Sequence, residues 1–249
     1  MTIKNAKQCL REEVIPALRE RSPYSDVTSI RHLLTEKDAH VERETLNRYM
    51  SELTDAGFVF SAGRGWYSFL KIPFLLGTES LDDLTNKINH KFPLLDFACW
   101  STQQINRFMH HLLAKFVQFV YTERDVMASV FDHLRDAGYD VYLNPTKREA
   151  DKIFSIGEKT IVLRPTITKS PIQGHVAPIE KILVDLSIEC KVLPLMDQSE
   201  FRGMCQNLVT SERVVMSELM SYARRRGVAL NDLFENPQST ISTFARKWR

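Results

Sequence analysis

A polar segment between residues 42 and 55 has side chains of the types that read DNA. In the major groove, arginine can hydrogen-bond guanine through its fork of N–H groups, and asparagine can hydrogen-bond adenine through its amide. The candidates recur at helical spacing, so they would share one face of a helix. This face consists of Arg43, Glu44, Asn47, Arg48 and Ser51.

The segment that follows adds one more candidate DNA contact. Residues 58–69 contain two β-rich runs around a glycine-containing turn, which predicts a β-hairpin. Arg64 stands at the tip between two glycines, where its guanidinium could touch a phosphate or enter the minor groove. Trp66 and Tyr67 would anchor the hairpin against the helices.

An E-x-K triplet, Glu189 and Lys191, with Asp185 four residues earlier, raises the question of catalysis. Metal-dependent nucleases place an Asp and an E-x-K on adjoining strands, where carboxylates hold Mg²⁺ and the lysine positions the attacking water. Here the three residues lie in one stretch of helical periodicity, so the match is poor. Asp140 or Asp151 could supply the separate carboxylate, but nothing in the sequence selects either. We expect no catalytic residues and keep a metal-dependent nuclease-like α/β domain as the alternative function.

No metal or cofactor site is expected either. His110 and His111 are adjacent, so on a helix they would point about 100° apart and would not share a metal ion. The four cysteines form no CxxC pair, which predicts reduced and mostly buried thiols. The chain contains no G-x-S-x-G, GxxxxGK[ST] or GxGxxG motif.

Two basic clusters fall outside the polar segment. A loop at residues 144–152 follows an expected strand and, with Arg164 and Lys169, could face a phosphate or an acidic partner; a solvated loop is the favoured interpretation. The tail could dock on DNA, on the acidic middle of the chain or on a partner, and its Arg224 cluster could instead complement a helix dipole. Its basic residues are Arg224, Arg225, Arg226, Arg246, Lys247 and Arg249.

The elements that must position the polar segment occupy residues 1–72. A helix over residues 3–20 interrupted at Pro16, a short helix capped at Ser25-Asp26, and a third helix ending at Gly57 are expected. The third helix buries one apolar stripe, made of Leu46, Met50 and Leu53. Three helices and a hairpin are the plan of a winged helix-turn-helix, and Glu42–Val59 with the hairpin resembles bacterial winged-helix regulators.

The remainder predicts an α/β domain. Residues 73–91 would form a connector that ends in a polar helix, and residues 92–249 an α/β domain with a mostly parallel sheet and C-terminal helices. Strands are expected at 94–100, 115–121, 139–143 and 159–165, alternating with helices at 102–113 and 124–137. Helices are expected at 179–188, 199–209 and 212–226.

The segment at residues 178–186 carries a second resemblance. Its apolar residues form a helical stripe, while Glu180, Lys181 and Asp185 are expected to face solvent, the last two as a weak pair worth about 0.3 kcal/mol. Downstream of a winged helix, this segment, together with the strand around Leu95 and Trp100-Ser-Thr, resembles the AbiEi-type antitoxins of type IV toxin–antitoxin systems. The resemblance implies a winged helix that represses its own operon and an α/β domain that counteracts a nucleotidyltransferase-like toxin, in phage defence.

Composition narrows the class of protein. The 249 residues suffice for two modest domains, and 43% hydrophobic with 26% charged residues is the balance of a globular chain. Because 33 Lys+Arg nearly cancel 31 Asp+Glu, nucleic-acid contact must come from a local patch. The sequence shows no signal peptide and no apolar stretch near the ~20 residues that a membrane span needs, which predicts a soluble, cytoplasmic protein.

These observations lead to one expected function and two alternatives. We expect a non-enzymatic transcriptional repressor and antitoxin whose partners are double-stranded operator DNA and, through the resemblance, a nucleotidyltransferase-like toxin. A homodimer on inverted repeats is possible, and no membrane contact is expected. The nuclease-like alternative remains, as does a plain regulator whose C-terminal domain senses a small molecule.

Overall fold

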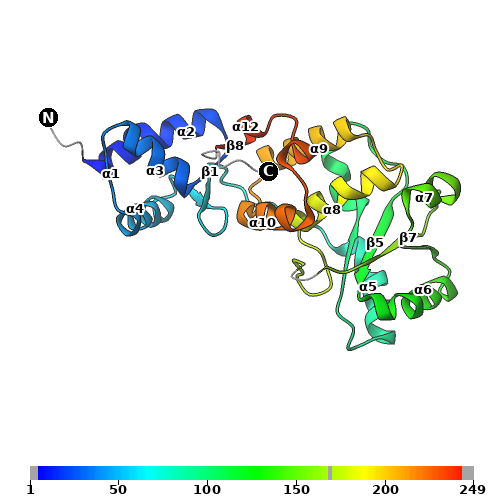
Figure 1. The fold of residues 1–249 in the computed structure, drawn as a ribbon. Helices are drawn as coiled ribbons and strands as arrows, with labels where there is room; N and C mark the ends of the chain where they lie inside the picture. Colours follow the sequence, from blue (N-terminus) through cyan, green and yellow to red (C-terminus); the bar gives the residue numbers. More distant parts are fainter. Residues whose placement is uncertain (1–4, 168–169, 243–249) are drawn as a thin grey trace. The chain divides into compact units, whose positions relative to one another are not determined.

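The computed structural model describes residues 5–167 and 170–242, and the chain divides into two compact units (Figure 1). Within the described residues, unit 1 runs to Phe74 and resumes at Cys205, while unit 2 spans Leu75–Met204. The fold is mixed α/β, as predicted, with one four-stranded sheet in each unit. The division differs from the expected 1–72, 73–91 and 92–249, because the C-terminal residues lie with the N-terminal helices.

Three helical segments open unit 1. The first segment begins at its N-cap, Asn5, and contains a wider π-helical turn. Pro16 falls in the first turn of the α-helix that follows this π turn. Asp26 caps the second segment as predicted, because its Oδ1 accepts a hydrogen bond from the Ser29 backbone N–H at 2.7 Å. The segments are α1 (Ala6–Cys9), the π turn (Leu10–Val14) and α2 (Ile15–Arg21), then α3 (Val27–Glu36), then α4 (Arg43–Asp55).

The sheet of unit 1 has the order β2-β3-β1-β8. The hairpin strands pair antiparallel, as predicted, and β3 also pairs antiparallel with β1. At the other edge β8 pairs parallel with β1, which brings the C-terminal part of the chain into this sheet. The strands are β1 (Tyr24–Asp26), β2 (Phe60–Ser61), β3 (Trp66–Ser68) and β8 (Ile241–Ser242).

Helices from the C-terminal part complete unit 1. Helix α9 (Gln198–Ser211) begins in unit 2 and ends in unit 1. The helix predicted at 212–226 ends where expected, at Gly227, whose left-handed φ of 66° is one that glycine adopts without strain. The other helices are α10 (Met216–Arg226), α11 (Leu230–Leu233) and α12 (Pro237–Thr240).

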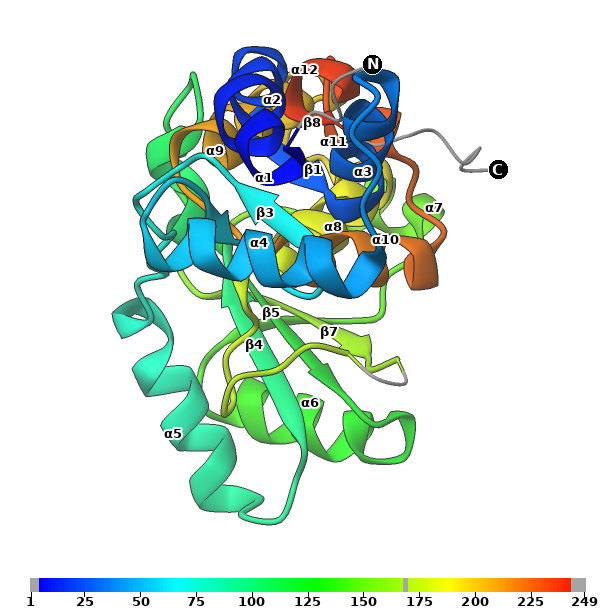
Figure 2. The same ribbon diagram turned by 90° about the vertical axis from the view of Figure 1, so that its left-hand side faces the viewer.

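Unit 2 is built on the sheet β4-β5-β7-β6. Strand β4 pairs antiparallel with β5, and the two remaining pairings are parallel, so the prediction of a mostly parallel sheet is confirmed. Helices α5 (Asp82–Lys91) and α6 (Met127–Asp136) cover one face (Figure 2). The strands are β4 (Phe97–Ser101), β5 (Val117–Thr122), β6 (Asp140–Leu143) and β7 (Thr160–Pro165).

The opposite face of this sheet packs against α8 (Ile179–Val192). Successive side chains of a strand point to opposite faces, so Val120 joins the core under α5 and α6 while Tyr121 faces α8. On β7, Leu163 likewise joins the core under α5 and α6, while Arg164 faces α8.

Three expectations for unit 2 need correction. The proposed connector at 73–91 includes α5 and a 3₁₀ turn (Glu79–Leu81), whose apolar residues belong to the core of unit 2. Most of the loop expected at 144–152 is helical instead, forming α7 (Lys147–Ile153), because Thr146 and Glu149 make a capping box. The helix expected at 102–113 is a shorter 3₁₀ segment (Thr102–Phe108), and a 3₁₀ turn (Arg124–Val126) precedes α6.

Candidate functional site

The candidate DNA-reading face lies on α4, which is amphipathic. Its apolar stripe is buried as predicted, with Leu46 and Met50 at 0% exposure and Leu53 at 8%. The stripe packs into the core that α4 shares with α2 and α3, which fixes the helix about its own axis. The opposite side is exposed at every predicted position: Arg43, Glu44, Asn47, Arg48 and Ser51.

Few contacts hold the polar side chains of this face. Within residues 5–167 and 170–242, Arg43 and Asn47 make no side-chain hydrogen bond or ion pair. The Arg48 guanidinium lies 5.5 Å from the centre of the Tyr49 ring, in cation–π contact. Glu52 pairs with Lys7, and the hydrogen bond from Lys7 holds the pKa of this carboxyl below its usual value.

The turn of the hairpin carries Arg64 into solvent. Trp66 donates its backbone N–H to the Gly63 carbonyl at 3.0 Å, and the φ angle of Gly63 is 94°, a region that favours glycine. The Gly65 carbonyl accepts a hydrogen bond from the Val27 backbone N–H at 2.9 Å, which ties the turn to the start of α3. Arg64 is exposed and, among the described residues, makes no side-chain hydrogen bond or ion pair.

One of the expected hairpin anchors packs on the helices. Tyr67 lies half-buried against the helical core of unit 1, and burial raises the pKa of its hydroxyl. Trp66 is also partly buried and pairs with Asp26 of β1. The hairpin is therefore a fixed part of unit 1.

Residues of the C-terminal part also hold the hairpin, which was not foreseen from the sequence. The Arg213 guanidinium donates to the carbonyls of Leu70 and Lys71 at 2.9 and 3.0 Å and stacks on the Phe60 ring at 4.9 Å. The Tyr24 hydroxyl accepts a hydrogen bond from the Val214 N–H at 2.9 Å. These contacts join residues more than 140 positions apart, so no local pattern could have indicated them.

Glu180, Lys181 and Asp185 of α8 are buried, which corrects the expectation that they face solvent. Lys181 and Asp185 are both 0% exposed and form an ion pair with an N–O distance of 2.6 Å. The Lys181 ammonium lies 3.9 Å from the centre of the Tyr121 ring on β5. Glu180 is 4% exposed. The contact with Tyr121 of the sheet therefore replaces part of the water that would otherwise solvate these charges.

A second buried pair joins β7 to the same helix. Arg164 donates to both carboxylate oxygens of Glu189, from Nε at 2.9 Å and from Nη2 at 2.6 Å. Its Nη1 donates to the carbonyl of Pro145 and to Asn144 Oδ1. Arg164 is therefore turned inward, not toward a ligand beyond the strand ends, and Lys169 lies outside the described residues.

This geometry gives the nuclease-like alternative no support. Glu189 and Lys191 lie two positions apart on α8, so their side chains point about 200° apart and do not converge. The Glu189 carboxylate is already engaged by Arg164. Within the part of the chain that the structure describes, no group of three or more His, Cys, Asp or Glu side chains could hold a metal ion.

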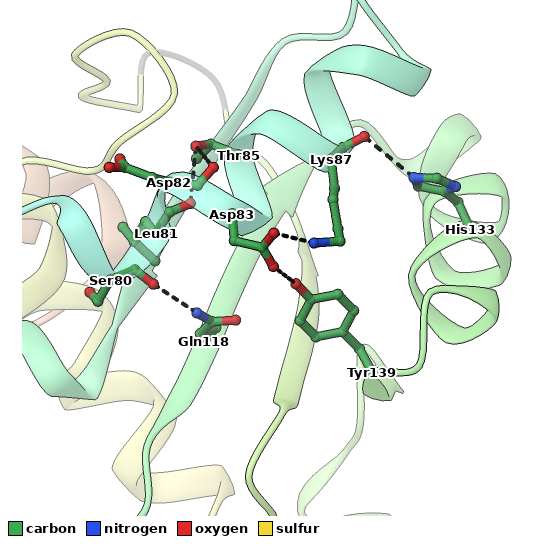
Figure 3. A network of polar contacts seen from close by, with 9 residues as sticks. All are labelled: Ser80, Leu81, Asp82, Asp83, Thr85, Lys87, Gln118, His133 and Tyr139. Atoms are coloured by element: carbon green, nitrogen blue, oxygen red, sulfur yellow. Dashed lines mark hydrogen bonds and ion pairs between the residues drawn. The ribbon is translucent and has the colours of Figure 1, made fainter.

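A third polar cluster clips α5 to the start of β6 (Figure 3). The Tyr139 hydroxyl donates to Asp83 Oδ2 at 2.6 Å, and Lys87 pairs with the same carboxylate. The hydrogen bond from Lys87 lowers the pKa of Asp83, whereas burial, followed by the Asp83 contact, raises the pKa of Tyr139. The side chains satisfy one another, so the cluster has the character of a structural clip.

The remaining candidates lie outside α4 and the hairpin. His110 and His111 are exposed neighbours, with Nδ1 and Nε2 3.3 Å apart. The four cysteines are free, and three of them are buried. Arg246, Lys247 and Arg249 lie outside the described residues. No helix among the residues described combines the length and apolar character needed to cross a membrane.

Together, the fold and this site define a two-unit α/β protein whose first unit presents a polar helix face and an arginine-tipped hairpin. The chain belongs to a family of unknown function (DUF6577), whose model matches residues 45–238. The match begins within α4 and ends within α12, so it includes parts of both units. No curated protein matches the chain.

Proposed function

We propose that this protein is a cytoplasmic transcriptional autorepressor and antitoxin. Unit 1 would bind operator DNA as a winged helix-turn-helix, and unit 2 would oppose a nucleotidyltransferase-like toxin without catalysis. The observation that carries the proposal is the solvent exposure of the α4 face, Arg43, Asn47 and Arg48, together with Arg64 at the hairpin turn.

The order and packing of the elements support DNA contact. Helices α3 and α4 precede the hairpin, and α4 buries only its apolar stripe, so its polar side could enter a major groove about 12 Å wide. A rigid core behind the helix would set its register on the duplex. The hairpin turn would then meet the backbone or the minor groove beside it.

The charge of the face is compatible with specific readout. Glu44 accompanies Arg43 and Arg48, and the Lys7 ammonium offsets the nearby carboxylate of Glu52. A face of mixed charge attracts DNA weakly in general, so affinity would depend on base contacts as well as on phosphates. Two copies on an inverted repeat would double these contacts, which favours a homodimer on the operator.

The antitoxin half of the proposal rests on the resemblance of residues 178–186 to AbiEi-type antitoxins. These residues form the start of α8, where Lys181, Asp185 and their apolar neighbours are buried. They would therefore maintain the fold of unit 2, while exposed residues would meet the toxin.

Operator binding tests the DNA half. In a gel shift with the DNA upstream of the chain's own gene, Arg43→Ala, Asn47→Ala and Arg48→Ala should each weaken binding, with a loss of about 1–3 kcal/mol where a bidentate base contact is removed. Arg135→Ala, an exposed arginine on α6 in unit 2, is the matched control. Unchanged affinity in the three α4 variants would refute the assignment.

Coexpression tests the antitoxin half. Cells that express the neighbouring nucleotidyltransferase-like gene should survive when the full chain is supplied from an independent promoter. The triple variant Arg43→Ala/Asn47→Ala/Arg48→Ala should protect equally well, because toxin opposition would not need DNA. Cell death in the presence of the folded wild-type chain would exclude the antitoxin role.

A further inference from the structure

Helix α10 begins in direct contact with the hairpin turn of unit 1. The Ser217 backbone N–H donates to the Ala62 carbonyl at 3.1 Å. A Cβ added to Gly63 would lie 1.9 Å from Ser217 Oγ, so the glycine allows this close approach. The first turn of α10 therefore adjoins the residue that precedes Arg64.

From that contact a polar stripe continues along α10. Ser221 lies one turn beyond Ser217, about 6 Å further along the helix axis, and is exposed. Arg225 is also exposed, and its Nη1 donates to Ser221 Oγ at 3.4 Å. The guanidinium thus reaches back along the helix, toward the hairpin turn rather than away from it.

We propose that Arg225 and Ser221 form a second phosphate-binding contact, next to the one that Arg64 makes at the hairpin turn. This inference rests on the proposed DNA-binding function and extends the DNA-contacting surface beyond α4 and the hairpin. The ligand is the sugar–phosphate backbone of double-stranded DNA, for which guanidinium and hydroxyl groups are common donors.

The arrangement of unit 1 supports one continuous surface. Figure 1 shows the hairpin turn between α4 and α10. A duplex that receives α4 in its major groove and passes the hairpin would then reach α10. Each strand carries one phosphate per 3.4 Å of the helix axis, so a guanidinium two turns into α10 has a phosphate within reach at many orientations.

Two features of α10 oppose or compete with this role. Glu218 is exposed and would repel a phosphate, because it points only about 20° from Arg225 around the axis, two turns nearer the start of the helix. The last turn holds three arginines, Arg224, Arg225 and Arg226, which also complement the negative end of the helix dipole. A dipole role affects stability, whereas a phosphate contact affects the salt dependence of binding, so the two roles can be separated.

The test measures affinity for operator and for unrelated duplex DNA across a range of salt concentrations, with the full chain. Arg225→Gln should weaken binding to both duplexes about five-fold at 0.15 M salt and make the negative slope of log K against log salt shallower by about one. Arg135→Gln is the control, because Arg135 is likewise exposed in the last turn of a helix and stacks on an aromatic ring one turn back. It should leave both quantities unchanged.

A gain-of-charge variant guards against loss through misfolding. Ser221→Arg places an additional guanidinium on the exposed stripe and should make the negative slope steeper by about one while tightening binding to both duplexes. Arg225→Gln with wild-type affinity and slope, while Arg43→Gln binds weakly, would overturn this contact and leave the proposed function intact. A wild-type chain that binds no duplex would overturn both.

Discussion

Helices α4 and α8 carry similar numbers of charged side chains, but those of α4 are exposed and most of those of α8 are buried. On α4 the charges lie in solvent around a buried apolar stripe. On α8 the residues from Ile179 to Ser187 are buried on every side, including Lys181 and Asp185 at 0% exposure. The difference comes from what covers each helix, because Tyr121 and Arg164 of the sheet approach α8 with polar groups.

The comparison separates charges that maintain a fold from charges that are free to bind. Burying an ion pair removes both charges from water, and good geometry with additional hydrogen bonds must offset that desolvation. Removing one partner therefore leaves the other charge buried and uncompensated, which lowers stability. An exposed charge costs little to remove and keeps its capacity for an outside partner. Substitutions on the two helices should therefore have opposite effects on stability and on binding.

The largest effect on stability is expected from Lys181→Met. The variant leaves the Asp185 carboxylate buried without its ammonium partner, which should lower the free energy of unfolding by about 3–5 kcal/mol. Chemical denaturation of the full chain measures this loss. Lys87→Met is the matched control, since Lys87 pairs with Asp83 at the same i, i+4 distance but at the surface, and should cost less than about 1 kcal/mol.

The double variant Lys181→Met/Asp185→Leu sharpens this prediction. Replacing both charges by apolar groups removes the stranded carboxylate, so most of the lost stability should return. A double variant no more stable than Lys181→Met would show that the pair is not the source of the loss.

Glu189→Gln should have the next largest effect, about 2–3 kcal/mol. The amide keeps the size of the carboxylate but loses its charge and one of the two acceptors that face Arg164. Arg164 retains its hydrogen bonds to Pro145 and Asn144, so the loss should be smaller than for Lys181→Met. Denaturation curves in the same buffer compare the two variants, and the opposite order of stability would contradict this ranking.

Sequence patterns predicted α4 well because its signals are local. The spacing of Leu46, Met50 and Leu53 sets the buried side, and Gly57, with a φ of 71°, follows the helix end. The capping box of Thr146 and Glu149 is also a local signal, and it marks the start of α7.

The parts that sequence could not predict depend on distant residues. Whether Lys181 faces water is decided by Tyr121, 60 positions away, and no periodicity within α8 contains that information. The placement of the C-terminal part in unit 1 depends on contacts such as Tyr24 with Val214. Helical spacing therefore indicates which residues share a side, while the fold decides what that side meets.

The surface clip of Asp83 and Tyr139 should give a small, pH-dependent contribution. Because the folded pKa of Asp83 is lowered, chiefly by Lys87, its stabilisation is present above the usual value of 3.8 and is lost as pH falls through the lowered pKa. Since Asp83 is mostly exposed, solvent screening limits the effect to less than about 1 kcal/mol.

Tyr139→Phe tests this contribution. The folded pKa of Tyr139 is raised, so its stabilisation is present below the usual value of 10 and is lost as pH rises through the raised pKa. The melting temperature, measured across a range of pH, should fall less steeply at both extremes in the variant than in the wild type. Identical profiles at acid pH would mean that the hydrogen bond to Asp83 contributes nothing, whereas burial alone can change the alkaline part.

The smallest effect on stability is expected on α4, and it completes the comparison. Arg43→Ala and Asn47→Ala remove exposed side chains that have no hydrogen bond or ion pair within the described residues, so the free energy of unfolding should change by less than about 0.5 kcal/mol. Alanine favours the helix more than asparagine does, so Asn47→Ala should be neutral or slightly stabilising. Chemical denaturation of the gel-shift variants measures this. A loss above about 2 kcal/mol would mean that this face is engaged within the protein, whereas unchanged stability with weakened DNA binding would assign these side chains to recognition.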